Sequence, residues 1–168
     1  MIIGLTGKNA AGKGEVAEYL KKRGFEYHSL SDEIREEVRQ RGREITRGLL
    51  IETGNELRTK YGPGVLAERV LERLEQDRNY VIDSIRNPGE VAALRRRKDF
   101  VLLAVEADAA SRFERSRIRS REGAAQTLEE FAIEEARELE SGDAARRSCA
   151  WTVRLYSSRS RRMAGSRL

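Results

Sequence analysis

The chain has 168 residues, of which 39% are hydrophobic and 36% charged, a composition typical of one globular domain that excludes a collagen-like fibre. One cysteine, Cys149, and one histidine, His28, exclude an internal disulfide framework and a structural zinc site. No apolar run approaches the roughly 18 residues of a transmembrane helix, and the first residues lack the basic start and long apolar stretch of a signal peptide. We therefore expect a cytoplasmic protein with no membrane partner.

The formal net charge of +5 originates at one end of the chain. Seven arginines and no acidic residue follow Asp143, whereas residues 1–143 carry slightly more acidic than basic side chains. We therefore expect a nearly neutral domain over 1–143 and a basic tail, rich in Arg, Ser and Ala, over 144–168. Any attraction for nucleic acid would come from this tail, and its composition is also typical of disordered chain.

Strands and helices are predicted to alternate along residues 1–143. Short apolar runs predict strands at 2–6, 25–30, 79–83 and 100–105. The last run is apolar without alternation, which is typical of a strand covered on both faces. Helical spacing, caps and breaking residues predict helices at about 15–24, 32–41, 46–60, 64–76, 88–97, 109–119 and 128–140. Ser31 or Asp32 is expected to cap the second of these helices, and one further strand is expected at 151–156. The alternation predicts an α/β fold with a parallel sheet.

The turn after the first strand carries the clearest chemical signal. It reads Gly7-Lys8-Asn9-Ala10-Ala11-Gly12-Lys13-Gly14 and fits the pattern G-x-x-x-x-G-K. Its glycines let several backbone N–H groups point at one centre, the next helix adds its positive dipole end, and the Lys13 ammonium reaches the β- and γ-phosphates. A plain glycine-rich turn would not explain Lys13. The pattern predicts a nucleoside-triphosphate site made by Gly7, Lys8, Asn9, Ala10, Ala11, Gly12, Lys13, Gly14 and Glu15.

The residues after Lys13 differ from the usual pattern. The Ser or Thr that helps to hold Mg²⁺ is replaced by Gly14, and Glu15 follows. The run Gly-Lys-Gly resembles the nucleoside monophosphate kinases, and Glu15 stands where the adenylate-kinase-like members have Thr. A carboxylate here would repel phosphates unless it faces away or binds the metal through water, so we expect Glu15 to act as a favourable acid in the first helical turn.

Two further segments resemble the acceptor side of these kinases. In Tyr80-Val81-Ile82-Asp83-Ser84-Ile85-Arg86, the resemblance implies that Asp83 orients Mg²⁺ or the acceptor and that Arg86 contacts the acceptor phosphate. The alternative is a surface turn that begins with Asp83. The segment Ser31-Asp32-Glu33-Ile34-Arg35 is similar to the opening of the acceptor-binding helices. The residues implied on those helices are Asp32, Arg35, Arg58 and Tyr61. Charged helices are, however, commonly solvated faces.

An arginine cluster follows the strand at 100–105, with Arg112, Arg115, Arg117, Arg119 and Arg121. In the same kinases, such a helix leads into a mobile lid, here at about 117–128, whose arginines close on the transferring phosphates. Arg115 and Arg119 lie four residues apart and match this role best, because guanidinium groups bind phosphate oxygens in pairs. The alternative is a surface helix with salt bridges to Glu106, Asp108 and Glu114.

The resemblance covers about residues 1–140 and extends to dephospho-coenzyme A kinases. The resemblance is stronger still to kinase-like proteins that are found alone or ahead of deoxycytidylate deaminase domains. Two runs carry this resemblance: Gly12-Lys13-Gly14-Glu15-Val16-Ala17 and Asp83-Ser84-Ile85-Arg86-Asn87-Pro88-Gly89-Glu90. It implies a P-loop NTPase three-layer sandwich, with acceptor-binding helices at about 32–76, in a monomer or homodimer. Residues 144–168 do not resemble the ending of that group.

The implied function is phosphoryl transfer from ATP and Mg²⁺ to a (deoxy)nucleoside monophosphate. Lys13, Arg115 and Arg119 would neutralise the phosphoryl charge, and Asp83 would orient the metal or the acceptor. The alternatives are a dephospho-coenzyme A kinase, an ATP-binding regulatory module without an acceptor, and nucleic-acid binding through the tail. His28 and Cys149 are expected to have no catalytic role.

Overall fold

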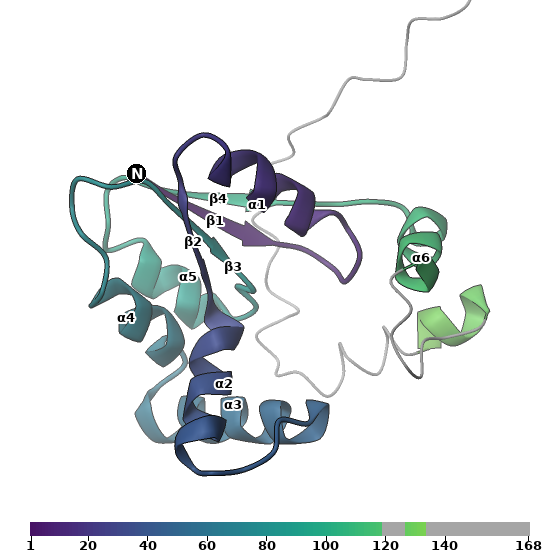
Figure 1. Cartoon of the computed structure of the whole chain (residues 1–168), viewed down its shortest axis with the longest axis horizontal. Helices are drawn as coiled ribbons and strands as arrows, with labels where there is room; N and C mark the ends of the chain where they lie inside the picture. Colours follow the sequence, from purple (N-terminus) through teal and green to yellow (C-terminus); the bar gives the residue numbers. More distant parts are fainter. Residues whose placement is uncertain (119–126, 134–168) are drawn as a thin grey trace, which may run out of the picture.

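A computed structural model describes residues 1–118 and 127–133 (Figure 1). The elements in chain order are β1 (Ile2–Thr6), α1 (Lys13–Lys21), β2 (Glu26–Ser29), α2 (Leu30–Gln40), α3 (Arg47–Tyr61), α4 (Val65–Leu71), β3 (Tyr80–Asp83), α5 (Pro88–Leu94), β4 (Phe100–Ala104) and α6 (Ala109–Ile118). A short helical segment follows at 128–133.

The four strands form one parallel sheet in the order β2-β3-β1-β4. Ile2 is paired with Tyr80 on one side and Phe100 on the other, so the strands are in register at their amino ends. Because all strands run the same way, the connections that follow β1, β2 and β3 leave from one edge of the sheet. Ligands of open α/β sheets bind outside this edge, at the point where successive connections pass to opposite faces.

Alternate strand residues face two separate cores. Ile2, Tyr80 and Ile82 belong to a large cluster with residues of α2, α3, α4 and α5, whereas Ile3, Leu5 and Val81 pack with α1. Figure 1 shows α1 on one side of the sheet and α4 and α5 on the other. The connection after β1 thus covers one face and the connection after β3 covers the opposite face. The crevice between the ends of these two central strands is therefore the expected place for a ligand.

The structure confirms the predicted α/β class and a three-layer arrangement with a helical insertion between β2 and β3. All four strands predicted within 1–143 form at the expected places. The expected cap of the second helix was wrong, because Ser29, the last residue of β2, is the N-cap of α2 and accepts a hydrogen bond from the Ser31 N–H at 3.3 Å. The strand passes directly into the helix, which brings the first turn of α2 to the edge of the sheet.

Three predicted features of the later elements were corrected. Helices α4 and α5 end earlier than the ranges 64–76 and 88–97, and α5 finishes in tighter turns, with Arg96 and Arg97 N–H groups bonded to carbonyls three residues back. Strand β4 was expected to be covered on both faces, yet Val101 is 41% exposed. Among the described residues β4 is an edge strand, and α1, the helix over that face, is packed nearer to β3 and β2.

Several predictions fall outside the described residues: most of the lid, the end of the helix 128–140, the strand 151–156, the tail 144–168, Arg119 and Cys149. The start of the helix 128–140 is confirmed, because Thr127 and Glu130 bond reciprocally through side chain and backbone at 3.1 and 3.3 Å. Within 1–118 and 127–133, no helix has the length and apolar character needed to cross a membrane.

Candidate functional site

The loop between β1 and α1 is curled by residues with positive φ. Gly7, Ala10 and Gly12 have φ values of 135°, 57° and 105°. A Cβ atom on Gly7 would lie 2.2 Å from the Val105 carbonyl oxygen, so a side chain there would collide with the backbone that follows β4. Ala10 adopts a conformation that costs an L-residue energy, and such strain is concentrated at functional sites. The loop is thus held in a curl that its sequence would not adopt in isolation.

The Lys13 side chain lies across this curl. Its ammonium donates hydrogen bonds to the carbonyl oxygens of Gly7 at 2.8 Å and Lys8 at 2.9 Å. Gly12, the N-cap of α1, has no side chain to cap the helix, and the first turn of α1 begins at this loop. An ammonium group and the positive end of a helix therefore converge on one point, which is the arrangement that binds phosphate.

A cavity of about 360 Å³ opens in front of this loop. It is lined by four segments: the loop from Asn9 to Gly14, the β2–α2 junction, the end of β3, and Ser116 of α6. The cavity lies at the carboxyl edge of the sheet, where β1 and β3 send their connections to opposite faces. Its volume is within the range of small-molecule sites.

The end of β3 supplies the carboxylate of the cavity. Asp83 accepts a hydrogen bond from the Ser84 N–H at 2.6 Å and one from the Tyr27 hydroxyl at 3.4 Å. Burial, and next the negative charge of Asp83, raise the pKa of Tyr27, which keeps this hydroxyl protonated as a donor. Ser84 has a positive φ of 65°, and its hydroxyl accepts a hydrogen bond from the Ser29 hydroxyl at 3.1 Å. The hydrogen bond between these two serines thus joins the ends of β2 and β3 inside the cavity.

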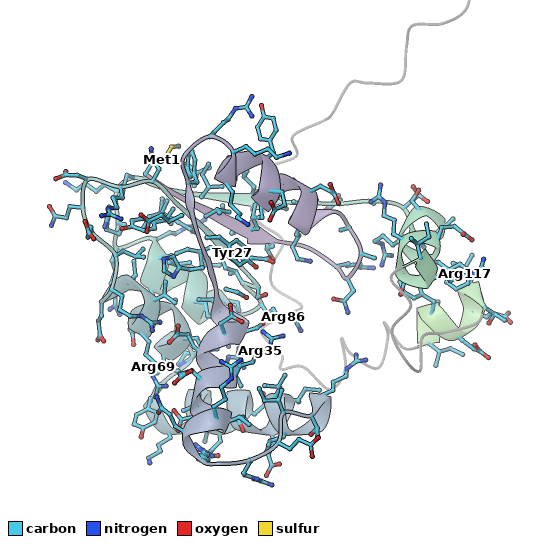
Figure 2. All side chains as sticks on the ribbon, in the orientation of Figure 1. Met1, Tyr27, Arg35, Arg69, Arg86 and Arg117 are labelled. Atoms are coloured by element: carbon cyan, nitrogen blue, oxygen red, sulfur yellow. The ribbon has the colours of Figure 1, made fainter. Side chains whose placement is uncertain are left out.

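Two arginines outside the loop also line the cavity. Arg35, from the second turn of α2, donates to Asp32 at 2.9 Å, and Arg86 follows β3. Figure 2 shows Tyr27, Arg35 and Arg86 at the same edge of the sheet. One cavity therefore holds Lys13 on one wall and two guanidinium groups on another. The structure brings together Asp32, Arg35, Asp83 and Arg86, as the sequence predicted.

The arginine-rich helix α6 divides its side chains among three environments. Arg115 donates to the loop carbonyl oxygens of Ala10 at 3.4 Å and Ala11 at 3.3 Å, which joins α6 to the curl. Arg117 pairs with Glu114 at 3.3 Å, well away from the cavity, as the surface-helix alternative predicted (Figure 2). Arg112 is buried against the Phe131 ring and bonds to the Ala107 carbonyl at 3.0 Å. Desolvation lowers the pKa of Arg112.

Two predicted acceptor residues do not line the cavity. Arg58 donates instead to Glu90, a buried carboxylate on α5, at 2.9 Å. Tyr61 is 51% exposed and lies beside the Lys60 ammonium, 5.0 Å from its ring centre. Gly7, Lys8 and Glu15 belong to the loop and its helix but are not among the residues that line the cavity.

Sequence reasoning missed Tyr27, Ser29, Ser84 and Ser116, which line the cavity. For Ser29 and Ser84, the available signal was their position at or just after the ends of β2 and β3, since parallel strands end at one edge, whereas Tyr27 lies two residues before the end of β2. Ser116 lies one residue after Arg115, and nothing local distinguishes it. His28 is a packing residue, as expected, with its ring 5.7 Å from that of Tyr80.

The donor set fits a magnesium ion that arrives with a nucleotide. Within the part of the chain that the structure describes, no group of three or more His, Cys, Asp or Glu side chains could hold a metal by itself. Mg²⁺ is commonly bound by one or two carboxylates together with substrate phosphates and water. Asp83 offers one such carboxylate beside the Ser29 and Ser84 hydroxyls, so these oxygens fit an ion whose remaining ligands come from phosphate.

The curled loop, its lysine and the parallel sheet define a P-loop nucleotide-binding α/β protein. A protein-family model described as an AAA domain matches residues 3–140. A UPF0200 protein of Methanothermobacter thermautotrophicus is 37% identical over 145 residues, covering 84% of this chain and 74% of the relative. A UPF0200 protein of Pyrococcus abyssi is 35% identical over 149 residues, covering 84% and 80%. The chain therefore belongs to the AAA domain family and to the UPF0200 proteins.

Solved structures agree with this fold. The crystal structure of TT1252 from Thermus thermophilus superimposes with a TM-score of 0.53 at 25% identity, covering 82% of this chain and 78% of that one. A chain in the Pnkp1/Rnl/Hen1 RNA repair complex superimposes with a TM-score of 0.50 at 15% identity, covering 84% of this chain and 46% of the other. The second likeness concerns the fold alone.

Proposed function

We propose that the protein transfers a phosphoryl group from ATP and Mg²⁺ to a small phosphorylated acceptor, namely a (deoxy)nucleoside monophosphate. The supporting observation is that one cavity has a phosphate-binding loop on one wall and two arginines, Arg35 and Arg86, on another. A site that only binds or hydrolyses ATP needs one anion-binding wall. Two such walls across a single small cavity provide places for a donor and for an acceptor that each carry phosphate.

On the donor side, the loop N–H groups and Lys13 bind the β- and γ-phosphates. Phosphoryl transfer spreads negative charge over the oxygens of the moving group, and fixed cations lower the barrier because they are already oriented. Arg115 reaches the loop carbonyl oxygens from α6, and we assign its charge to stabilising these phosphates. Asp83 would help to hold a bound Mg²⁺, which would neutralise part of the phosphate charge. Arg119 is assigned by the same proposal to the segment that closes over the donor.

On the acceptor side, Arg35 and Arg86 bind the acceptor phosphate. Asp32 orients Arg35 through the hydrogen bond at 2.9 Å. Asp83 lies between the two walls, where it holds the metal or orients the attacking phosphate oxygen. The reaction needs no covalent enzyme intermediate, because the acceptor oxygen attacks the γ-phosphorus directly and ADP leaves. The role of the protein is to place both groups in line.

A screen of acceptors tests this proposal. ADP formation from ATP is measured with each ribo- and deoxynucleoside monophosphate and with dephospho-coenzyme A, with and without Mg²⁺. At least one monophosphate is expected to accelerate turnover. Lys13→Ala is expected to lower the accelerated rate by about a hundredfold or more, because a fixed cation at the transferring group is lost.

Lys22→Ala is the matched control, since Lys22 is exposed at the far end of α1. It is expected to leave both rates unchanged. Acceleration by dephospho-coenzyme A alone would change the assigned acceptor. ATP binding without acceleration by any acceptor would contradict the kinase proposal and favour a regulatory nucleotide-binding module.

A further inference from the structure

The connection from β3 to α5 carries three residues of the cavity: Asp83, Ser84 and Arg86. Its first part is tied to the neighbouring strands. The Thr6 hydroxyl of β1 donates to the Ile85 carbonyl oxygen at 3.0 Å, and the Ser29 hydroxyl of β2 donates to Ser84 at 3.1 Å. Its second part, from which the Arg86 side chain extends, is held by a different group.

That group is the carboxylate of Glu90, in the first turn of α5. Its Oε2 atom accepts hydrogen bonds from the N–H groups of Arg86 at 2.8 Å and Asn87 at 3.0 Å. Its Oε1 atom accepts from Nη2 of Arg58 at 2.9 Å and from Nε at 3.2 Å. Glu90 has no exposed surface. A carboxylate buried in this way needs a paired charge, and among the described residues Arg58 supplies it.

The chain leaves space for this pair. Arg58 lies on α3, and its side chain is 18% exposed. A Cβ atom on Gly54, one turn earlier, would lie 3.1 Å from the Arg58 Nη1 atom and 2.9 Å from the Ile34 Cδ1 atom. Gly54 therefore lets the guanidinium group lie against α3 while it reaches α5. This buried contact is built into α3 rather than formed by a mobile surface side chain.

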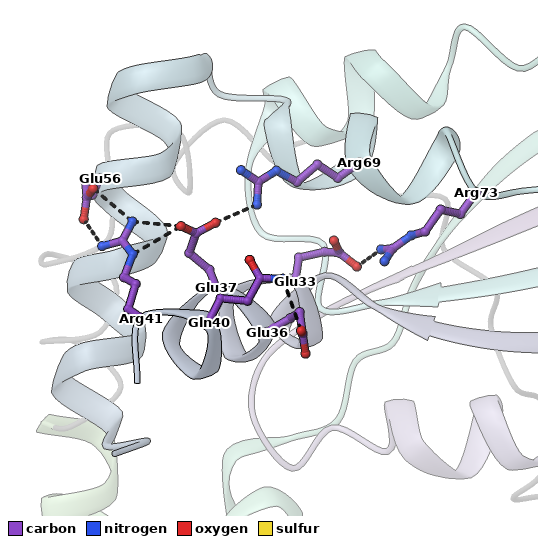
Figure 3. A network of polar contacts seen from close by, with 8 residues as sticks. All are labelled: Glu33, Glu36, Glu37, Gln40, Arg41, Glu56, Arg69 and Arg73. Atoms are coloured by element: carbon purple, nitrogen blue, oxygen red, sulfur yellow. Dashed lines mark hydrogen bonds and ion pairs between the residues drawn. The ribbon is translucent and has the colours of Figure 1, made fainter. Parts of the chain in front are cut away.

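Helix α3 is also fastened to the helix that carries Arg35. Arg41, which follows α2, contacts Glu56 of α3 at 2.7 Å and Glu37 of α2 at 3.1 Å (Figure 3). The helices α2 and α3 are thus joined by Arg41, and α3 is joined to the β3–α5 connection by the Arg58–Glu90 pair. This series of contacts begins at α2, which carries Arg35, and ends at the β3–α5 connection, which carries Arg86. These are the two arginines of the acceptor wall.

We propose that Arg58 and Glu90 are positioning residues for the acceptor wall. Neither lines the cavity. Glu90 fixes the backbone of Arg86, and Arg58 holds Glu90 in place and links it to α3, so the spacing between Arg35 and Arg86 depends on the pair. The expected effect of the pair on the acceptor KM rests on the proposed function. The expected effect on the position of the Arg86 backbone does not depend on that function.

The test compares Arg58→Met with a matched control, Arg69→Met. Arg69 also joins two helices through a glutamate, Glu37, at 3.0 Å, but it does not touch the β3–α5 connection. With the monophosphate that accelerates turnover, Arg58→Met is expected to raise the acceptor KM by about tenfold, with ATP affinity unchanged, since small displacements of positioning groups have effects of this size. Arg58→Lys is expected to recover part of the loss. Arg69→Met should leave the acceptor KM unchanged.

A double variant separates positioning from folding, because Arg58→Met alone leaves a buried charge unpaired. In Arg58→Met/Glu90→Gln, the amide oxygen still accepts from the Arg86 and Asn87 N–H groups without a charge. Its unfolding temperature is expected to recover toward that of the wild type, whereas its acceptor KM stays raised. A normal acceptor KM in the folded double variant, or an equal loss of ATP affinity, would overturn the proposal.

Amide hydrogen exchange gives a readout that needs no acceptor. The amides of Arg86 and Asn87 are expected to exchange faster in Arg58→Met than in Arg69→Met, with the β1 amides unchanged. If no monophosphate accelerates the wild-type protein, the proposed function has failed, and this exchange pattern alone decides whether the pair positions the connection. Equal exchange in the two variants would overturn it.

Discussion

The two walls of the cavity are built in different ways. The wall that we propose for the donor is one continuous stretch of the loop, from Asn9 to Gly14, which includes Lys13. The acceptor wall is made of side chains from the β2–α2 junction and from the β3–α5 connection, which are about fifty residues apart in the chain. The first wall depends on local conformation, and the second depends on the packing of helices and strands against each other.

This difference decides what a substitution does on each side. On the donor wall, the sensitive positions besides Lys13 are those where a side chain cannot be accommodated, because the other groups proposed to contact the ligand belong to the backbone. On the acceptor wall, the sensitive positions include residues that never touch the ligand, because they set where Arg35 and Arg86 stand. Variants on the two walls should therefore separate ATP binding from acceptor binding.

The largest effect is expected at Gly7. In Gly7→Ala, the new Cβ would lie 2.2 Å from the Val105 carbonyl oxygen, and φ is 135°. We expect a loss of about 3 kcal/mol or more in the free energy of unfolding, because backbone must move and a disfavoured φ is imposed. Urea denaturation measures this, and ATP titration should show that binding is lost as well.

Gly24→Ala is the matched control for Gly7→Ala. Gly24 also has a positive φ, 84°, but a Cβ there would meet nothing within 4 Å. Its cost is expected to be about 1 kcal/mol, from the backbone alone, and ATP binding should be retained. Equal costs at the two positions would contradict the close approach of Gly7 to the strand β4.

An intermediate effect is expected at Arg86. Arg86→Ala should raise the acceptor KM by about ten- to a hundredfold, which corresponds to about 1.5–3 kcal/mol for a charged hydrogen bond, and should leave the Kd for ATP unchanged. Arg39→Ala serves as control, because Arg39 is an exposed residue of α2 that pairs with Glu36 outside the cavity. A parallel loss of ATP affinity in Arg86→Ala would show that the two walls are not separate.

The donor wall could be predicted from sequence because everything it needs is consecutive. The glycines, Lys13 and the strand before them are read within one short segment, and the strands themselves follow from short apolar runs. The cap of α2 was misplaced by two or three residues for a physical reason. Ser29 is both the last residue of β2 and the N-cap of α2, and only the sheet register shows that no loop lies between the two elements.

The acceptor wall was predicted only in part. Arg35 lies in the helix that begins where β2 ends, and Arg86 follows the end of β3. Both strands end at the carboxyl edge of the sheet, so the sequence could predict that the two arginines come to this edge. Arg58 could not be assigned, because a helical arginine gives no sign of whether it faces a ligand or a buried carboxylate. That choice is made by Glu90, whose pairing with Arg58 becomes visible only when α3 and α5 are packed together.

The smallest effect is expected at Tyr27, which lies between the two walls. Burial, and next the charge of Asp83, raise the pKa of Tyr27 above its usual value near 10. The protonated hydroxyl is therefore favoured by folding, and the stability it contributes is complete below pH 10. This contribution is lost as the pH rises through the raised pKa, because the unfolded chain releases the proton first.

Tyr27→Phe removes this titration together with a hydroxyl that donates to Asp83 at 3.4 Å. At neutral pH the loss in the free energy of unfolding should be about 1 kcal/mol or less, because the hydrogen bond is long and the residue is 39% exposed. Above pH 10, the variant should lose stability less steeply than the wild type in urea denaturation series. Tyr19→Phe, at an exposed tyrosine of α1, should follow the wild-type curve. Matching alkaline curves for Tyr27→Phe and wild type would mean that folding does not raise the pKa of Tyr27.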